Sequence, residues 1–343
     1  MKKNYTHTHP KINLRTEKDL LLFLNAKATK DRRYKIPRKL VSQKDVAYIR
    51  QNVHLDWKDY AYGGDSLKFE SAAEKGKMTR SIKQNSCLDV VNRRLNASFR
   101  RVLDKHVPDV FYGSVSGRTH ILAAKELTNG KKTVFLSFDI QKFFESISSN
   151  RVQRFFVKAG CTKEIADFLV SITCVPLGVK GLQKDKLSLA RGFPTSPRLA
   201  LWCTFEIFSK LNRILQKSFS HLFPKIVLYV DDIGISLKNP SEDEIVQIRD
   251  LVFELIESDK NGLSLTVHRD PPKFRVQKVE GRAEHLGVAI GKSKIAVGSK
   301  TVRNIAIVKN QLLSTNDKDE RGRVLQKKRG LMNYRKTVTK NNL

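Results

Sequence analysis

Residues 225–237 read Lys-Ile-Val-Leu-Tyr-Val-Asp-Asp-Ile-Gly-Ile-Ser-Leu, two apolar runs joined by a pair of aspartates. Apolar runs of this length, rich in β-branched residues and separated by two residues, predict a β-hairpin. Asp231 and Asp232 would then stand at its tip. Carboxylates at the end of apolar strands call for an explanation, because a charge held near a core is costly unless something pairs with it.

A second apolar strand also carries an acid at its end. Residues 133–140 read Thr-Val-Phe-Leu-Ser-Phe-Asp-Ile, and Asp139 lies next to the last position. The chain then continues with helical patterns, the hairpin, another helix and another strand. This order predicts a split βαβ unit, an antiparallel sheet with its helices on one face. The fold class is therefore α+β, and Asp139 would lie beside the hairpin tip.

Helical and strand patterns surround this unit. Three helices are predicted at 17–28, 42–52 and 88–103. Further helices are predicted around Arg154, from Thr162 onward, after an N-cap at Ser196, after a cap at Ser241, and beyond about 301. Further strands are predicted at 78–82, 274–279 and 285–290, the last joined by a hairpin at 291–294 to 295–297. We expect the strands after 274 to complete the sheet.

The chain is strongly basic. Its 343 residues include 65 Lys and Arg against 34 Asp and Glu, a formal charge of +31, and 40% of its residues are hydrophobic. That apolar content supports a core and excludes wholesale disorder. The charge favours RNA or DNA as the partner, because cations set against phosphates release condensed counterions, with an anionic membrane surface as the competing interpretation.

Composition also points to a cytoplasmic protein. No run of about 18 apolar residues and no secretory leader is visible, so no membrane partner is expected. The cysteines are widely separated and no histidine cluster has metal-site spacing, which indicates reduced core thiols. These cysteines are Cys87, Cys161, Cys174 and Cys203.

The converging acids suggest a metal-dependent chemistry. Three carboxylates at one sheet edge would repel each other unless a cation lay between them, and hard oxygen ligands suit Mg²⁺. Two such ions about 3.5–4 Å apart are the usual device for in-line phosphoryl transfer. We therefore predict two Mg²⁺ ions, with Mn²⁺ as a substitute, at Asp139, Asp231 and Asp232.

Three motifs in this order resemble the palm motifs of reverse transcriptases, most nearly those of bacterial retrons and phage-defence systems. They are Phe138-Asp-Ile-Gln-Lys-Phe-Phe144, Arg191-Gly-Phe-Pro-Thr-Ser-Pro197 and Tyr229-Val-Asp-Asp232. The likeness extends more weakly over about 75–334. It implies a right-hand polymerase with fingers at 1–132 and 150–190, a ferredoxin-like palm at 133–149 and 191–300, and a short helical thumb at 301–343.

The resemblance also implies roles for individual residues. Asp139 and Asp231 would bridge the metals with help from the Ile140 backbone, Asp232 would be the third acid, and Lys273 would protonate pyrophosphate. The implied nucleotide pocket consists of Lys77, Arg80, Gln141, Phe144, Arg191 and Gly192. The implied primer and template contacts are Tyr229, Val230, Gly287, Arg323, Lys327, Lys328 and Tyr334.

Phe144 matches the steric gate against a ribose 2′-hydroxyl, with Phe143 packed inward, and Arg80 matches the arginine that grips the incoming phosphates. Each role has an ordinary alternative. Phe144 could be a core aromatic, Arg80 a surface charge, and the basic stretch near 323–334 a solvated tail.

Three departures separate the chain from typical retron enzymes. Arg191 stands where most reverse transcriptases have Gln, residues 123–127 read Ala-Ala-Lys-Glu-Leu in place of an Asn-Ala-x-x-His box, and His285-Leu-Gly287 replaces Val-Thr-Gly. The resemblance thus implies a retron-like enzyme outside the typical retrons.

The predicted function is RNA-directed DNA synthesis on a dedicated non-coding RNA, in anti-phage defence. The expected partners are an RNA template, the DNA product and dNTPs. Two alternatives stay open: template-independent or protein-templated synthesis by the same fold, and a nucleic-acid-binding scaffold whose polymerase site is vestigial. The sequence also leaves open which RNA and primer are used, and whether an effector protein or further copies of the chain take part.

Overall fold

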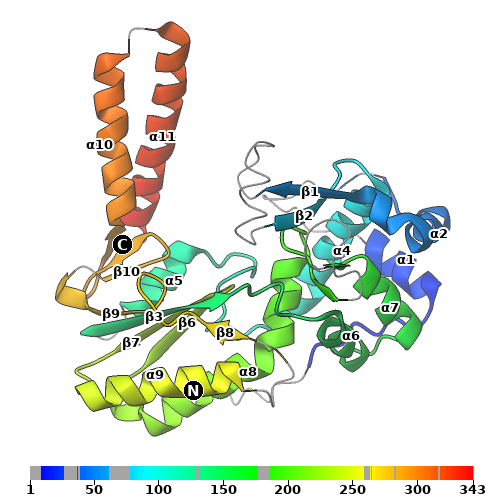
Figure 1. Cartoon of the computed structure of the whole chain (residues 1–343), viewed down its shortest axis with the longest axis horizontal. Helices are drawn as coiled ribbons and strands as arrows, with labels where there is room; N and C mark the ends of the chain where they lie inside the picture. The colour runs from blue at the N-terminus through cyan, green and yellow to red at the C-terminus, as the bar shows by residue number, and fades with distance from the viewer. Residues whose placement is uncertain are drawn as a thin grey trace.

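The structure is a computed structural model that describes residues 9–26, 37, 39–61, 78–128, 132–176, 186–258, 263, 265–281, 283–315 and 317–342. It is a mixed helix and sheet fold (Figure 1). The helices are α1 Glu17–Asn25, α2 Gln43–Asn52, α4 Cys87–Leu103, α5 His120–Leu127, α6 Ser149–Lys158, α7 Lys163–Ser171, α8 Ser196–Ser218, α9 Glu242–Glu257, α10 Ser299–Ser314 and α11 Lys318–Lys340. The strands are β1 Trp57–Ala61, β2 Met78–Ile82, β3 Val134–Gln141, β4 Cys174–Pro176, β5 Leu187–Leu189, β6 Lys225–Tyr229, β7 Asp232–Leu237, β8 Thr266–Val267, β9 Arg275–Lys278, β10 Ala283–His285, β11 Val288–Ile290 and β12 Ile295–Val297.

The central sheet is built around β3. Its strand order is β6-β7-β3-β8, β9 also pairs with β3, and every pairing is antiparallel. The predicted order of strand, helices, hairpin, helix and strand is observed. Phe138 packs with Phe253 of α9, with ring centroids 6.0 Å apart, whereas Phe135 packs with Leu127 of α5 on the opposite face. Figure 1 shows α8 and α9 on one side of this sheet and α5 on the other.

The last strands do not complete the central sheet as the sequence predicted. β10, β11 and β12 form a separate three-stranded antiparallel sheet, and only β9 and the short β8 join β3. The expected single strand over 285–290 is interrupted because Leu286 (φ 54°) and Gly287 (φ 75°) both adopt left-handed backbone and turn the chain. The predicted hairpin at 291–294 is confirmed by a 2.9 Å bond from the Gly291 N–H to the Lys294 carbonyl.

Helix α8 holds the turn at 191–195 against the core. Its predicted apolar stripe is buried, comprising Leu201, Phe205, Phe208, Leu211 and Leu215. Ser196 is not the N-cap that the sequence predicted. Thr195 takes that position, because the Ser196 hydroxyl donates instead to the Ala190 carbonyl at 2.5 Å. This bond ties the start of the helix to the preceding turn.

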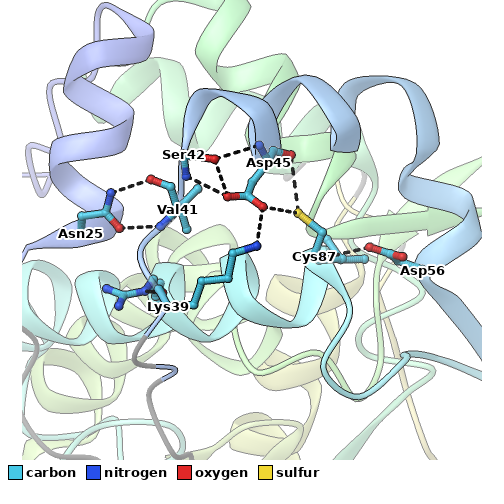
Figure 2. A network of polar contacts seen from close by, with 9 residues as sticks. Asn25, Lys39, Val41, Ser42, Asp45, Asp56 and Cys87 are labelled. Atoms are coloured by element: carbon cyan, nitrogen blue, oxygen red, sulfur yellow. Dashed lines mark hydrogen bonds and ion pairs between the residues drawn. The ribbon is translucent and has the colours of Figure 1, made fainter.

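A polar network joins the N-terminal helices (Figure 2). The side-chain amide of Asn25 donates to the Val41 carbonyl at 2.7 Å and accepts from the Val41 N–H at 2.9 Å. Asp45 completes the predicted capping box with Ser42 and accepts from Lys39 at 2.8 Å. These contacts tie the end of α1 and the segment at 39–42 to the start of α2.

The two C-terminal helices form a hairpin that projects from the rest of the molecule (Figure 1). It is anchored at its base, where Val338 of α11 is buried with Ile121 and Ala124 of α5 and Val288 of β11. Among the described residues, no helix is long and apolar enough to cross a membrane.

Candidate active site

The register of β3 and β7 brings the predicted carboxylates together. Asp139 lies directly opposite Asp232, and the Ile140 N–H donates to the Asp231 carbonyl at 3.1 Å. One detail differs from the prediction. The turn consists of Val230 and Asp231, and Asp232 is already the first residue of β7. The acids therefore come from two neighbouring strands and the turn that adjoins them.

This crowding changes the acidity of the group. The pKa of Asp232 is raised to about 7, first by burial and then by the neighbouring carboxylates of Asp231 and Asp139. Burial also raises the pKa of Asp231, with Asp139 adding to the effect. Lys273 opposes both shifts. Neighbouring carboxylates repel each other when all are ionised, and a hard divalent cation bound by their oxygens would remove this repulsion. These residues therefore fit the Mg²⁺ predicted from the sequence.

Two basic side chains contact Asp139. Lys273 Nζ lies 2.6 Å from Asp139 Oδ2, and His268 Nε2 lies 3.4 Å from Oδ1. Hydrogen bonding to Asp139 raises the pKa of Lys273. Within the described residues, no three His, Cys, Asp or Glu side chains form a preformed metal cage. Asp139 instead contacts the Lys273 ammonium group and the His268 ring.

The turn that carries Asp231 has an unusual backbone. Val230 has φ 61°, a left-handed conformation that a β-branched residue rarely adopts and that costs free energy. The segment before α5 supports it, since the Tyr112 N–H donates to the Leu228 carbonyl at 2.8 Å. A Cβ at Gly113 would lie 2.4 Å from the Val230 nitrogen, so only glycine permits this approach. Backbone packing thus fixes the turn.

Aromatic residues follow the first carboxylate strand. Phe143 is buried, with 1% of its surface exposed, as predicted, and Phe144 is half-buried. Their rings meet edge to face, with centroids 5.6 Å apart. Gln141 ends β3, where it pairs with Thr266 of β8.

The other residues of the predicted nucleotide pocket lie on separate elements. Arg191 forms an ion pair with Glu145 at 3.2 Å, next to Gly192, whose φ of 92° requires glycine. Arg80, in β2, donates to the Pro176 carbonyl at 2.7 Å and lies over the Trp57 ring. Lys77 lies outside the described residues.

Two of the predicted primer and template contacts, Tyr229 and Tyr334, are linked through His120. The Tyr334 hydroxyl of α11 lies 3.1 Å from His120 Nε2, and the two rings stack with centroids 5.7 Å apart. The His120 ring meets the edge of Tyr229, which pairs with Asp232. The helical hairpin is thereby connected to the carboxylate site.

Val230 lies in the turn beside Asp231, whereas the other four predicted contacts lie on other elements. Gly287 lies in the turn between β10 and β11. Arg323 and Lys327 are exposed on α11, and Lys328 is half-buried there. Figure 1 shows α11 projecting away from the central sheet.

Four residues that contact or influence the site were not predicted from the sequence. His268 contacts Asp139, Arg275 lowers the pKa of Asp232, Glu145 pairs with Arg191, and Gly113 supports the Val230 turn. Alternate residues of a strand lie on the same face, so Ser137 shares a face of β3 with Asp139. Arg275 of β9 pairs with Ser137, so the alternation along β9 could have placed Arg275 on that face. The other three belong to no motif.

Comparison with known proteins agrees with this geometry. The sequence model of a family described as "Reverse transcriptase (RNA-dependent DNA polymerase)" matches residues 73–269. The chain is also 27% identical over 171 residues to the retron Ec86 reverse transcriptase of Escherichia coli, which covers 50% of this chain and 46% of that protein. The chain thus spans about half the length of this relative. Because the family match covers more than half of the chain and includes all three carboxylates, the chain belongs to the reverse transcriptase (RNA-dependent DNA polymerase) family.

Proposed function

We propose that this chain is an RNA-directed DNA polymerase, a nucleotidyltransferase that adds dNTPs to a primer 3′-hydroxyl. One observation carries the proposal: Asp139 faces Asp232 across two strands, and Asp231 occupies the adjoining turn. Family membership supports the same activity.

In this proposal the three aspartates and the Ile140 carbonyl hold two Mg²⁺ ions, or Mn²⁺ as a substitute. When bound, such ions lower the pKa of the attacking hydroxyl and neutralise charge on the triphosphate. The strained Val230 turn keeps Asp231 in place beside β3, so little reorganisation is needed when substrate binds.

Lys273 is proposed as the residue that delivers a proton to the leaving pyrophosphate. Its ammonium group already lies at the carboxylate site, 2.6 Å from Asp139. The transfer would move one proton from Nζ to a pyrophosphate oxygen as the bond to the transferred phosphorus breaks. Lys273 would have to leave Asp139 to do this.

The nucleotide pocket is proposed to use Phe144 and Gln141 below the sugar and Arg191, Gly192, Arg80 and Lys77 around the triphosphate. The half-buried position of Phe144 beside a fully buried Phe143 supports a rigid floor. Arg80 would exchange its bond to the Pro176 carbonyl for phosphate oxygens, which suit its planar fork.

The hand-like division follows from the same proposal. The palm would be 133–149 and 191–300, which hold the central sheet with α8 and α9. The fingers would be 1–132 and 150–190, which hold α1, α2, α4, α5, α6 and α7, and the thumb would be the helical hairpin at 301–343. The primer and template contacts proposed are Tyr229, Val230, Gly287, Arg323, Lys327, Lys328 and Tyr334. Exposed cations on α11 would follow the duplex backbone without reading its sequence.

The template is proposed to be a dedicated non-coding RNA, copied in anti-phage defence. Similarity to a retron reverse transcriptase supports this choice. The departures at Arg191, at 123–127 and at 285–287 support the proposal that the chain is a retron-like enzyme outside the typical retrons.

Primer extension on matched templates tests the activity and its alternatives. We expect extension of an RNA-templated primer, with a product complementary to the RNA. Extension of equal length without template would favour template-independent or protein-templated synthesis. RNA binding without extension under any condition would favour a vestigial scaffold and overturn the proposal.

A further inference from the structure

A basic hollow lies on the outer side of α6 and α7. It has a volume of about 530 Å³ and is lined by Arg151, Gln153, Arg154, Val157, Lys158 and Lys163. Figure 1 shows α6 and α7 on the opposite side of the molecule from the α10 and α11 hairpin. None of the residues assigned above to catalysis, nucleotide or duplex contacts lines this α6 hollow.

Some of its charge is neutralised within the protein. Glu206 of α8 lies 3.0 Å from Lys158 and 3.8 Å from Arg151. Asp167 accepts a hydrogen bond from Gln153. Glu164, next to Lys163, is paired with Arg50 of α2 at 3.3 Å.

Two cations remain without such a partner. Arg154 and Lys163 are both exposed, and neither side chain forms an ion pair or hydrogen bond with the described part of the chain. They lie on two helices that contact each other and border one hollow. Two unpaired cations in a concave surface attract an anion more strongly than the same charges spread over a convex one.

The floor and rim of the hollow are firmly held. Val157 leaves 49% of its surface exposed, while Phe155 and Phe156 of the same helix are buried in the core. Arg151 Nε donates to the Cys203 carbonyl of α8 at 2.9 Å, which fixes the rim. The exposed apolar surface of Val157 beside guanidinium and ammonium groups suits a nucleotide, whose base can cover carbon while its phosphates meet the cations.

We propose that the α6 hollow binds a single-stranded segment of RNA outside the polymerase site. The inference rests on the proposed function, which makes RNA the polymer that this protein holds. RNA is favoured over an anionic membrane because the site is a concave hollow of nucleotide size, whereas lipid headgroups form a broad flat surface. Its role would be to hold part of the template RNA while another part is copied.

The test is the double variant Arg154→Gln with Lys163→Gln. Its matched control is Arg213→Gln with Lys217→Gln, which removes one exposed arginine and one exposed lysine from α8 that likewise have no ion pair within the described residues. The probe is a 20-nucleotide oligouridylate. Its binding is measured by fluorescence anisotropy over a salt series.

We expect the hollow variant to bind this RNA about tenfold more weakly. The slope of log affinity against log salt should fall by about 1.4, since each lost phosphate contact on a single strand removes about 0.7. The control variant should keep the wild-type slope. Equal affinity and slope in the hollow variant, or an equal loss in the control, would overturn the proposal.

A second substitution tests the floor without removing a cation. Val157→Asp places a carboxylate in the hollow, and its control is Val246→Asp on α9, a valine that is 42% exposed. We expect weaker RNA binding only for Val157→Asp. The contrary outcome is that these variants bind anionic lipid vesicles more weakly than the wild type does while their RNA binding is unchanged. In that case the hollow is a membrane site and the RNA assignment is wrong.

Primer extension separates this inference from the proposed function. On a hairpin template and primer too short to leave the polymerase site, the hollow variants should extend at the wild-type rate. Failure of wild-type extension would contradict the proposed function alone. Unchanged oligouridylate binding by hollow variants that still extend primers would contradict only the proposal that the α6 hollow binds RNA.

Discussion

Lys273 and Asp139 form an ion pair, with Nζ 2.6 Å from Oδ2, at the point where three carboxylates meet. One oxygen of a carboxylate that we propose as a metal ligand is therefore held by a cation of the protein itself. Binding of metal and nucleotide would have to displace this lysine, which would release its ammonium group toward the leaving pyrophosphate.

Lys273→Ala should lower the extension rate at saturating Mg²⁺ by about 10²-fold, the scale of one lost general acid. The same variant should reach half of its own maximal rate at a lower Mg²⁺ concentration, because the competing cation is gone. Extension rates across a Mg²⁺ series measure both effects. Lys278→Ala, an exposed lysine on β9, is the control. An unchanged maximal rate for Lys273→Ala would exclude the proton-transfer role.

Phe144→Ala should raise ribonucleotide incorporation relative to deoxyribonucleotide, because a half-buried ring proposed as the pocket floor is removed. Phe143→Ala should instead reduce the free energy of unfolding by about 3–5 kcal/mol, since that ring is 1% exposed. The measurement is the ratio of kcat/KM for one dNTP and its matching rNTP. If Phe143→Ala alone shifts this ratio, the two roles are exchanged. If neither shifts it, Arg191 is the next residue to test.

Tyr334→Phe should loosen the link between the helical hairpin and the sheet. It removes the hydroxyl that lies 3.1 Å from His120 Nε2 but keeps the stacked ring, at a cost of about 1 kcal/mol. We expect shorter products on a long template and a normal rate of first addition on a short one.

A double-mutant cycle with His120→Phe tests whether this contact is responsible. The two substitutions together should cost less than the sum of the single effects, because each removes the same bond. Fully additive losses in product length would show that Tyr334 acts without His120.

Sequence patterns predicted the part of the site that depends on apolar strands and on the order of the elements. The apolar runs at 133–140 and 225–237, in a split βαβ order, placed Asp139 beside the hairpin tip, and the register with Asp232 confirms this placement. His268 and Gly113 were missed because their contacts with Asp139 and Val230 depend on tertiary packing between distant segments. The separate sheet of β10 to β12 was missed because Leu286 adopts a left-handed conformation that leucine rarely takes. Nothing in an apolar and polar pattern signals such a residue.

A buried lysine just before β3, Lys132, gives a pH dependence that does not involve the carboxylates. Burial lowers the pKa of Lys132 from 10.5 to about 8, with Lys225 and Lys238 adding to the effect, and its ammonium donates to the Phe223 carbonyl. Between these pH values the unfolded chain binds more protons than the native one, so the free energy of unfolding from this group rises with pH. The full change is on the order of 3 kcal/mol.

Denaturant unfolding from pH 7.5 to 10.5 measures this effect. Lys132→Met, which keeps the length of the side chain without its charge, should remove the rise. A rise of equal size in Lys132→Met would assign it to other groups.

The most direct test of the central claim is primer extension by the variant Asp231→Asn with Asp232→Asn. The control is Asp243→Asn with Asp250→Asn, two exposed acids of α9. We expect the site variant to lose extension by about 10³-fold or more, since several kcal/mol of charge stabilisation are removed, while the control extends normally. RNA affinity should stay within about twofold in both, because phosphate contacts lie on basic surfaces elsewhere. Wild-type extension by the site variant would contradict the account.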